Sequence, residues 1–264
     1  MSRHAMSAGY ERFAEPLTAQ FASAAIKLSG GVKPGNTAVD VAAGTGALAV
    51  ALAKTGASVL ATDIAPSKVD RLAERLKPYA DATAQIMDGQ QLTLPDAIFD
   101  KSYSLFGVTL FPDWRRGLKE LVRVTRPGGQ ITIATWVGPD GGGPPAILMP
   151  LYRDMFPQAI AHHLPPGLSI LSAAATLKDE LVRAGCAEVV VHSVEGSWGG
   201  LTTDDVMDNI DQMMNWMPLV GALNPYDRSR FDARLRDDIE TKNVSKEAVQ
   251  INVAANIAVC RKAA

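Results

Sequence analysis

A glycine turn between a short apolar strand and a helix constrains this chain more than any other feature. Residues 39–43 (VDVAA) are followed by Gly44-Thr45-Gly46 and then by the apolar segment 48–53 (LAVALA). This order predicts a strand, a tight turn and a helix. Glycines let the backbone approach a ligand closely, and the N-terminus of the following helix points at the same place. We therefore expect a nucleotide-type site near the start of an α/β sheet.

Strand and helix patterns alternate about five times after this point. The expected strands are Thr37–Val41, Ser58–Thr62, Thr83–Met87, Phe99–Phe106 and Gln130–Val137, with Pro127-Gly128-Gly129 as the turn before the last. Helices are expected between them, with Ser67 and Asp113 as candidate N-caps. Such alternation predicts a parallel sheet with right-handed crossovers and helices on both faces.

The remaining segments are less regular. Residues 8–28 carry apolar positions at helical spacing, and residues 138–172 contain many glycines and prolines. A helix is expected over Ala173–Ala184, and strands over Glu188–Ser193 and Val249–Cys260. Two helical segments near 203–219 and 225–241 separate these strands. We interpret the chain as one domain, with N-terminal helices (1–35), a ligand-binding core (36–137), and a helical cap inserted over the sheet edge with the final strands (138–264).

Composition excludes several classes of protein. Hydrophobic residues make up 47% of the 264 residues and charged residues 20%, so a sizeable core is expected. The net charge of −2 and the absence of a basic run argue against nucleic acid as the main partner. The sequence shows no apolar run long enough for a membrane span and no metal-ligand cluster, and Cys186 and Cys260 form no CxxC pair. A cytoplasmic setting is the default, and a homodimer is left open.

Four residues fall where predicted strands end. Asp40, Asp63, Asp88 and Phe106 each lie at or just after the carboxyl end of a different strand. Ligands of doubly wound sheets bind at those ends, near the point where the strand order reverses. We therefore expect these four side chains to converge. Taken singly, Asp63 is equally well explained as a helix cap, Asp88 as part of a solvated turn and Asp40 as a brace for the glycine loop.

The glycine turn alone leaves two ligand classes open. The segment 44–49 (GTGALA) fits GxGxxA, and Asp63 follows Gly46 by 17 positions, as in an NAD-binding protein. However, Asp40 before the loop is unhelpful beside a pyrophosphate and suits a cationic ligand. Asp88 adds a third acid, and neither Tyr152 nor Tyr226 is followed by a lysine four residues on, as hydride-transfer chemistry would require.

Several segments together resemble class I S-adenosylmethionine-dependent methyltransferases. The resemblance is carried by residues 40–46 (DVAAGTG), 61–65 (ATDIA), 87–95 (MDGQQLTLP), 105–113 and 121–129 (LVRVTRPGG), and it covers roughly Tyr10 to Trp136. The nearest group is the ubiquinone/menaquinone methyltransferases and their natural-product relatives. The resemblance implies a Rossmann-like, doubly wound, mostly parallel seven-stranded sheet, with S-adenosyl-L-methionine as cofactor.

The resemblance also implies roles for individual residues. The backbone at Gly44 and Gly46 would wrap the methionine part of the cofactor, and Asp40 would offset the positive charge of the ammonium and sulfonium groups. The ammonium would donate to the carbonyl of Ala42 and to that of Leu105 or Phe106.

The nucleoside part of the cofactor would be held by the next two strand ends. Asp63 would accept from both ribose hydroxyls. Asp88 would accept from the adenine amino group, with the N–H of Gly89 nearby. Ile64 would pack against the adenine ring.

The acceptor and the catalytic groups are less defined. Methyl transfer depends largely on positioning, and a base helps when the acceptor is a phenol or an enolizable carbon. His162 and His163 are the candidate bases, although a surface or packing role is the more common one for such residues. We expect an enzyme that methylates oxygen or carbon of a small apolar or aromatic molecule. A protein that binds the cofactor without methyl transfer is the first alternative, and an NAD-dependent oxidoreductase is the second.

Methionines gather in the expected cap. Ile210, Met213, Met214 and Met217 lie at i, i+3, i+4 and i+7, on one helical face. Two interpretations are equally weighted: an apolar substrate pocket under a mobile lid, or a helix packed on its neighbours.

Overall fold

The computed structural model describes residues 11–160, 165–214, 219–242 and 248–263, and these residues form two compact units. The sheet unit comprises residues 18–139, 165–194 and 255–264. The helical unit comprises residues 1–17, 140–164 and 195–254. The assignment of the chain to one domain with a cap stays a prediction. None of the described helices combines the length and the apolar character that a membrane span needs.

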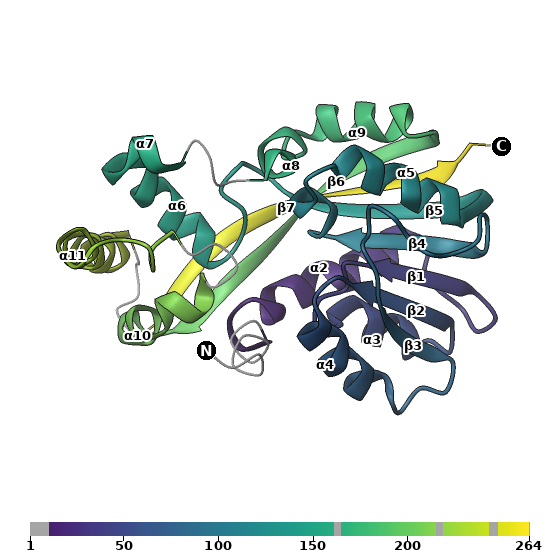
Figure 1. The fold of residues 1–264 in the computed structure, drawn as a ribbon, viewed down its shortest axis with the longest axis horizontal. Coiled ribbons are helices and arrows are strands. Elements are labelled where there is room, and N and C mark those ends of the chain that lie inside the picture. The colour runs from purple at the N-terminus through teal and green to yellow at the C-terminus, as the bar shows by residue number, and fades with distance from the viewer. Residues whose placement is uncertain (1–10, 161–164, 215–218, 243–247, 264) are drawn as a thin grey trace. The chain divides into compact units, whose positions relative to one another are not determined.

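A seven-stranded sheet with the order β3-β2-β1-β4-β5-β7-β6 runs through the sheet unit (Figure 1). The strands are β1 (Thr37–Val41), β2 (Ser58–Asp63), β3 (Ala82–Ile86), β4 (Phe99–Leu105), β5 (Thr125–Trp136), β6 (Cys186–Leu201) and β7 (Val249–Lys262). The pairs of β1 with β2 and β4, of β2 with β3 and of β4 with β5 are parallel, and β5 pairs with β7 antiparallel. The predicted doubly wound, mostly parallel sheet is confirmed, and its order reverses between β1 and β4.

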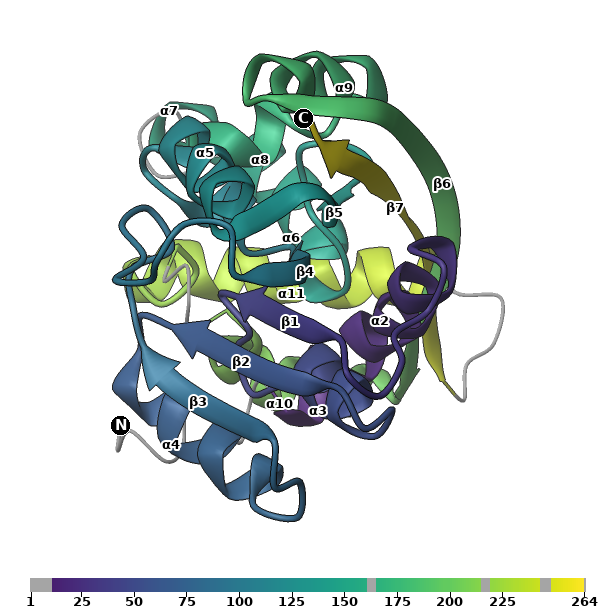
Figure 2. The same ribbon diagram turned by 90° about the vertical axis from the view of Figure 1, so that its right-hand side faces the viewer.

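Helices cover both faces of this sheet (Figure 2). They are α2 (Glu15–Leu28), α3 (Ala47–Ala53), α4 (Pro66–Leu76), the short 3-10 turn η1 (Val108–Leu110), α5 (Trp114–Val124), α8 (Pro166–Ile170) and α9 (Ala174–Arg183). Side chains of α3 and α4 share one buried apolar cluster with Ala38 of β1. Side chains of α5 and α9 share a second cluster with Val39 and Val41. Successive residues of a strand point to opposite faces, so β1 contributes to both clusters and is buried between them.

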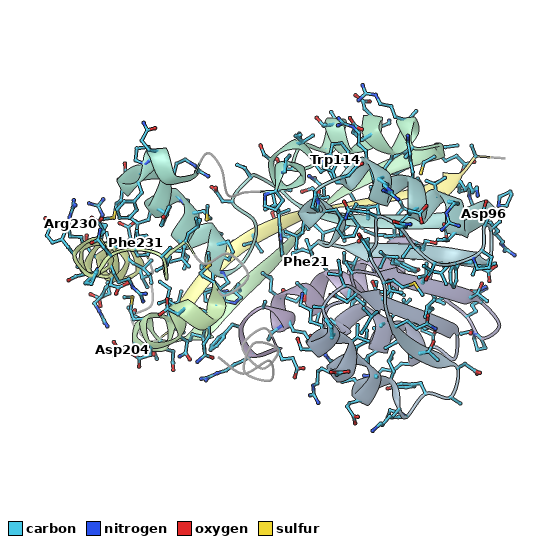
Figure 3. All side chains as sticks on the ribbon, viewed as in Figure 1. Phe21, Asp96, Trp114, Asp204, Arg230 and Phe231 are labelled. Atoms are coloured by element: carbon cyan, nitrogen blue, oxygen red, sulfur yellow. The ribbon has the colours of Figure 1, made fainter. Side chains whose placement is uncertain are left out.

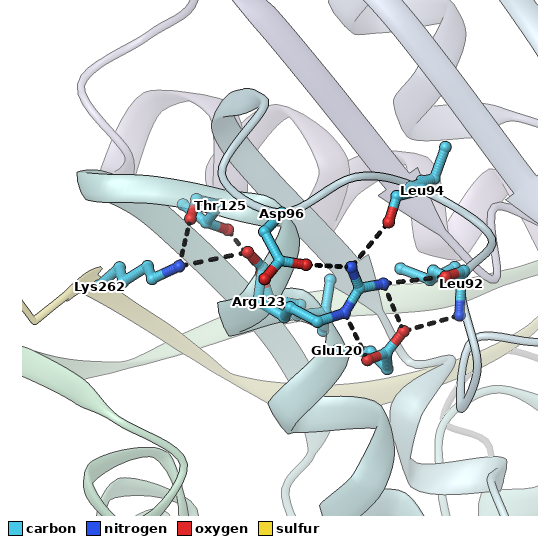
Figure 4. Close-up of polar contacts among 8 residues, drawn as sticks. Leu92, Leu94, Asp96, Glu120, Arg123, Thr125 and Lys262 are labelled. Atoms are coloured by element: carbon cyan, nitrogen blue, oxygen red, sulfur yellow. Dashed lines mark hydrogen bonds and ion pairs between the residues drawn. The ribbon is translucent and has the colours of Figure 1, made fainter.

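An arginine on α5 holds the loop that joins β3 to β4 (Figure 4). Arg123 donates to the carbonyl oxygens of Leu92 and Leu94 and to the carboxylates of Asp96 and Glu120, over 2.6–2.8 Å. Glu120 also accepts from the backbone N–H of Leu92 at 2.8 Å. The hydrogen bonds from Arg123 lower the pKa of Glu120. This network connects the β3–β4 loop, which contains Asp88, to the helix α5.

Two local predictions differ from the structure, and a third is confirmed. Strand β5 begins at Thr125, because Thr125 pairs with Phe99 before residues 126–129 bulge out and the pairing resumes at Gln130. The helix α4 has Ala65 at its N-cap and Pro66 in its first turn, so Ser67 is not the cap. The N-cap predicted at Asp113 is confirmed, because its carboxylate accepts from Arg116 N–H at 3.0 Å.

The helical unit contains α6 (Pro144–Met155), α7 (Pro157–Ile160), α10 (Thr203–Met213) and α11 (Pro225–Lys242). The sequence analysis expected a loop through Pro145 and only short helical pieces from Pro150 onward, whereas the structure has one continuous helix from Pro144 to Met155. Its two leading prolines stand at the first helical positions, where a missing N–H costs nothing. Rings of Tyr152, Phe156 and Phe231 pack together with centroids 5.0–6.4 Å apart.

The described part of the predicted methionine face is buried. Ile210, Met213 and Met214 are all buried, whereas Met217 lies outside the described residues. Burial of these side chains agrees with the packing interpretation. The lid interpretation stays a prediction.

We predict that Gly46→Ala destabilises the protein more than Gly30→Ala. Both glycines have positive φ, +100° and +74°, so alanine costs about 1–2 kcal/mol at either position. At Gly46 an added Cβ would also lie 2.3 Å from Cδ1 of the buried Leu72, whereas it meets nothing within 4 Å at Gly30. Overpacking of this kind costs about 1–3 kcal/mol more. Urea unfolding of both variants measures the difference, and equal losses would contradict the steric argument.

Candidate active site

The glycine loop after β1 is a backbone-lined turn. Ala42 and Gly44 have φ values of +59° and +60°, in the left-handed region. Ala43 N–H donates to Thr62 O at 2.8 Å, and Gly46 N–H donates to Ala43 O at 3.0 Å. These bonds hold the loop against the carboxyl end of β2. The loop and the start of α3 therefore present backbone groups at one point of the sheet edge, as predicted.

The carboxylate of Asp63 joins this loop to the next turn. Its Oδ2 accepts from the N–H of Gly44 at 2.9 Å, and its Oδ1 accepts from the N–H of Ala65 at 3.0 Å. The side chain is buried, at the last position of β2. Asp63 is not the cap of α4, because Ala65 is the N-cap residue and that helix has no side-chain cap hydrogen bond. Each oxygen keeps a second lone pair with which it can accept from a ligand hydroxyl.

Asp40 is a buried acid with an unused oxygen. Its side chain is 2% exposed, and Oδ2 has no hydrogen-bond partner within the described protein. Burial and the nearby Asp63 charge raise the pKa of Asp40 to about 8, although a hydrogen bond from the Ala49 backbone acts in the opposite direction. A cation bound beside Asp40 would stabilise the ionised forms of both neighbouring buried acids. This environment fits a ligand with an ammonium or sulfonium group.

The third strand end lies beside the second. Met87 N–H donates to Asp63 O at 3.1 Å, which places the start of the following loop against β2. The Asp88 carboxylate accepts from the backbone and the side-chain amide of Gln90, at 2.8 and 3.0 Å. An added Cβ on Gly89 would lie 2.4 Å from the ring of Phe111. A residue with a side chain would clash with this ring, so the close packing of Gly89 against Phe111 requires glycine.

Two further predicted residues flank these acids. Ile64 is 64% exposed, which leaves its side chain free to cover a flat ligand. Leu105 is the last residue of β4 and is half-buried. Neither side chain is positioned by a polar contact.

The end of β4 also meets the glycine loop. A Cβ added to Gly107 would lie 2.4 Å from Ala42 Cβ and 3.3 Å from Ala42 O, so the backbones at these two positions nearly touch. Phe106 has φ +62°, its N–H donates to Ala134 O at 2.8 Å, and its carbonyl accepts from Thr109 Oγ1 at 3.0 Å. The carbonyls predicted to accept from an ammonium therefore lie at adjoining turns.

The structure also shows residues that the sequence analysis missed. Trp136 ends β5, and its ring stacks on Phe106 at a centroid distance of 3.9 Å. Tyr103 pairs with Asp40 across β1 and β4, and its hydroxyl hydrogen-bonds Ser29 Oγ at 2.9 Å. Applying the strand-end rule to the fifth strand would have found Trp136. The predicted bases His162 and His163 lie outside the described residues.

Part of the chain is similar to a known protein family. Residues 39–133 match the sequence model of a family described as a methyltransferase domain. This segment is therefore similar to a methyltransferase domain, in agreement with the resemblance to class I S-adenosylmethionine-dependent methyltransferases described above. It is 40% identical over 108 residues to an uncharacterised protein of Mycobacterium tuberculosis, covering 40% of this chain and 39% of that protein. It is 32% identical over 142 residues to a demethylmenaquinone methyltransferase of Corynebacterium glutamicum, covering 54% of this chain and 56% of that enzyme.

A solved structure supports the same fold over most of the chain. A phosphoethanolamine N-methyltransferase of Haemonchus contortus, solved with S-adenosylhomocysteine, superposes with a TM-score of 0.57 at 16% identity. The superposition covers 93% of this chain and 53% of that one. At this identity the likeness shows the fold alone. The chain matches only about two fifths to just over half of the length of these curated relatives, over the methyltransferase domain and its flanks.

We predict that Asp40→Asn raises the free energy of unfolding, and that the gain grows with pH. Asp40 keeps its proton in the folded chain up to about pH 8, whereas the unfolded chain releases it near pH 4. Between these values wild-type folding is coupled to protonation of this acid and weakens as pH rises. One such group changes stability by at most about 1.4 kcal/mol per pH unit.

Urea unfolding at pH 5, 6, 7 and 8 tests this difference between variant and wild type. The exposed Asp70 provides the matched control Asp70→Asn, which removes the same charge from a solvated position. A stability difference for Asp40→Asn that is flat across these pH values would show that Asp40 ionises normally.

Proposed function

We propose that the protein transfers a methyl group from S-adenosylmethionine to oxygen or carbon of a small apolar or aromatic molecule. The observation that carries this proposal is the pair of buried acids beside the glycine loop. Asp63 holds the loop through Gly44 N–H, and Asp40 has an oxygen without a partner. A cationic nucleoside ligand would supply both the missing positive charge and the hydroxyl donors.

Residues at four strand ends would each bind a different part of the cofactor. The loop backbone at Gly44 and Gly46, with the carbonyls of Ala42 and of Leu105 or Phe106, would hold the methionine part. Asp63 would accept from the ribose, and Asp88 and Gly89 would meet the adenine, with Ile64 covering its face. When bound, the cofactor supplies an electrophilic methyl group on sulfur.

The protein's part in such a reaction is positioning and exclusion of water. Holding the acceptor in line with the sulfur–methyl bond makes the attack effectively unimolecular. The acceptor atom forms the new bond to the methyl carbon, and the electron pair of the broken bond stays on sulfur. The acceptor's proton goes to a base or to water. His162 and His163 remain the proposed bases.

Two findings on other proteins support the proposed cofactor and the proposed class of acceptor. The Haemonchus contortus structure holds S-adenosylhomocysteine in the same fold. The Corynebacterium glutamicum relative is named a demethylmenaquinone methyltransferase, which favours an aromatic, quinone-like acceptor for this chain as well.

The direct test is methylation of a panel of phenols, naphthols and quinols with S-adenosylmethionine, followed by mass spectrometry. We expect at least one acceptor to gain one methyl group. Binding of S-adenosylhomocysteine without any methylated product would favour the first alternative, a protein that binds the cofactor without methyl transfer. Binding of NADH in place of S-adenosylhomocysteine would favour an oxidoreductase.

We predict that Asp63→Ala weakens S-adenosylhomocysteine binding by about 1–3 kcal/mol, because charge-assisted hydrogen bonds to the ribose are lost. Asp70→Ala, on the exposed side of α4, should bind like wild type. Calorimetry measures both affinities, and circular dichroism checks that each variant is folded. Unchanged affinity in a folded Asp63→Ala protein would show that the ribose assignment is wrong.

Cofactor binding should also release a proton. A cation bound beside Asp40 favours its ionised form, and near pH 7 most of the free protein carries this proton because the pKa of Asp40 is about 8. Titrations in buffers of different ionisation enthalpy report the number of protons released. We expect nearly one for wild type and close to none for Asp40→Asn. Equal proton release by the two proteins would exclude Asp40 as the source.

A further inference from the structure

Three aromatic rings from separate elements meet at the end of the sheet next to the glycine loop. Trp136 stacks on Phe106 with an interplanar angle of 15°. Phe21 of α2 points its edge at both, with centroids 5.5 Å from Phe106 and 5.4 Å from Trp136. Figure 3 shows Phe21 on α2, apart from Trp114 on α5. The three side chains carry no charge, so the cluster suits an apolar neighbour.

The backbone at the centre of this cluster is strained. A positive φ, such as the +62° of Phe106, is unfavourable for a non-glycine residue. The hydrogen bonds of Phe106 with Ala134 and Thr109 hold it there. Glycine would relieve this strain, but it would remove the ring that stacks on Trp136. Phe106 therefore adopts an unfavourable backbone conformation in which its ring stacks on Trp136.

The cluster adjoins the proposed cofactor site. Gly107, which follows Phe106, abuts Ala42 of the glycine loop. Phe21 and Phe106 are buried, whereas Trp136 is only half-buried. Trp136 is therefore the most exposed residue of the cluster, and its ring stacks on the buried Phe106.

We propose that Trp136 is a positioning and specificity-determining residue that stacks against a flat, apolar aromatic ring of the methyl acceptor. This inference rests on the proposed function and narrows it to acceptors with an aromatic ring. Offset or edge-on packing of the ring on the indole would orient its reactive oxygen or carbon and displace water from it. Phe106 acts through Trp136, as the fixed ring beneath it.

The test measures ligand binding without turnover. With S-adenosylhomocysteine bound, calorimetric titration compares 1-naphthol with its saturated analogue decahydro-1-naphthol, which has the same carbon skeleton and hydroxyl but no aromatic ring. Trp136→Leu should bind 1-naphthol roughly 3- to 10-fold more weakly than wild type. Its affinity for the saturated analogue should change much less, and Trp136→Phe should restore most of the 1-naphthol affinity.

Trp114→Phe is the matched control, since Trp114 is buried in the cluster that contains the α5 and α9 side chains. Loss of that indole should lower stability and leave 1-naphthol binding unchanged. In the methylation assay, Trp136→Leu should raise KM for aromatic acceptors more than it lowers kcat.

Each outcome separates the inference from the proposed function. Equal 1-naphthol affinity of wild type and Trp136→Leu, or equal loss for both ligands, would overturn the stacking role. Binding of S-adenosylhomocysteine with no affinity of the wild type for 1-naphthol would overturn the aromatic acceptor and leave methyl transfer to an aliphatic acceptor. Failure to bind S-adenosylhomocysteine would overturn the proposed function itself.

Discussion

The carboxylate of Asp63 is the contact on which the arrangement of the site depends. One oxygen accepts from Gly44 N–H and the other from Ala65 N–H. The glycine loop and the start of α4, two turns from different parts of the chain, are therefore held by the end of one strand. A buried carboxylate needs such donors, because an unpaired charge in an apolar interior is costly. Each oxygen has a further lone pair with which it can accept another hydrogen bond.

Asp40 shows the cost of this arrangement. A second acid next to Asp63, with one oxygen unpartnered, is unfavourable for folding, and its raised pKa reflects that cost. Selection for stability alone would replace it by asparagine or an apolar residue. An acid at this position is explained if the folded protein binds a cation, because the charge of the cation would offset both carboxylates and stabilise the folded state. Stability and binding thus make opposite demands on the same side chain.

Much of the sheet unit could be predicted from the sequence, because its signals are local. Beta-branched runs, the glycine turn and the cap at Asp113 each act within a few residues, and the strand-end rule then brought Asp63 to Gly44. Signals that depend on distant partners were missed. The backbone conformation of Phe106 is held by Ala134 and Thr109, and the grip of Arg123 on the β3–β4 loop depends on side-chain reach. The start of α6 was missed because its two leading prolines were interpreted as part of a loop.

The site combines two environments that a transfer from a cationic donor requires. Asp63, together with Asp40 once a bound cation has displaced its proton, would provide negative charge beside the glycine loop. Phe106 and Trp136 provide uncharged rings near the same loop. Under the proposed function the acids would govern affinity for the cofactor, and the rings would govern the orientation and desolvation of the acceptor. Gly107 packs against Ala42, so the β4 turn that carries Phe106 lies against the glycine loop. A change in the β4 turn would therefore disturb cofactor binding and acceptor placement together, whereas a change at Trp136 would affect the acceptor alone.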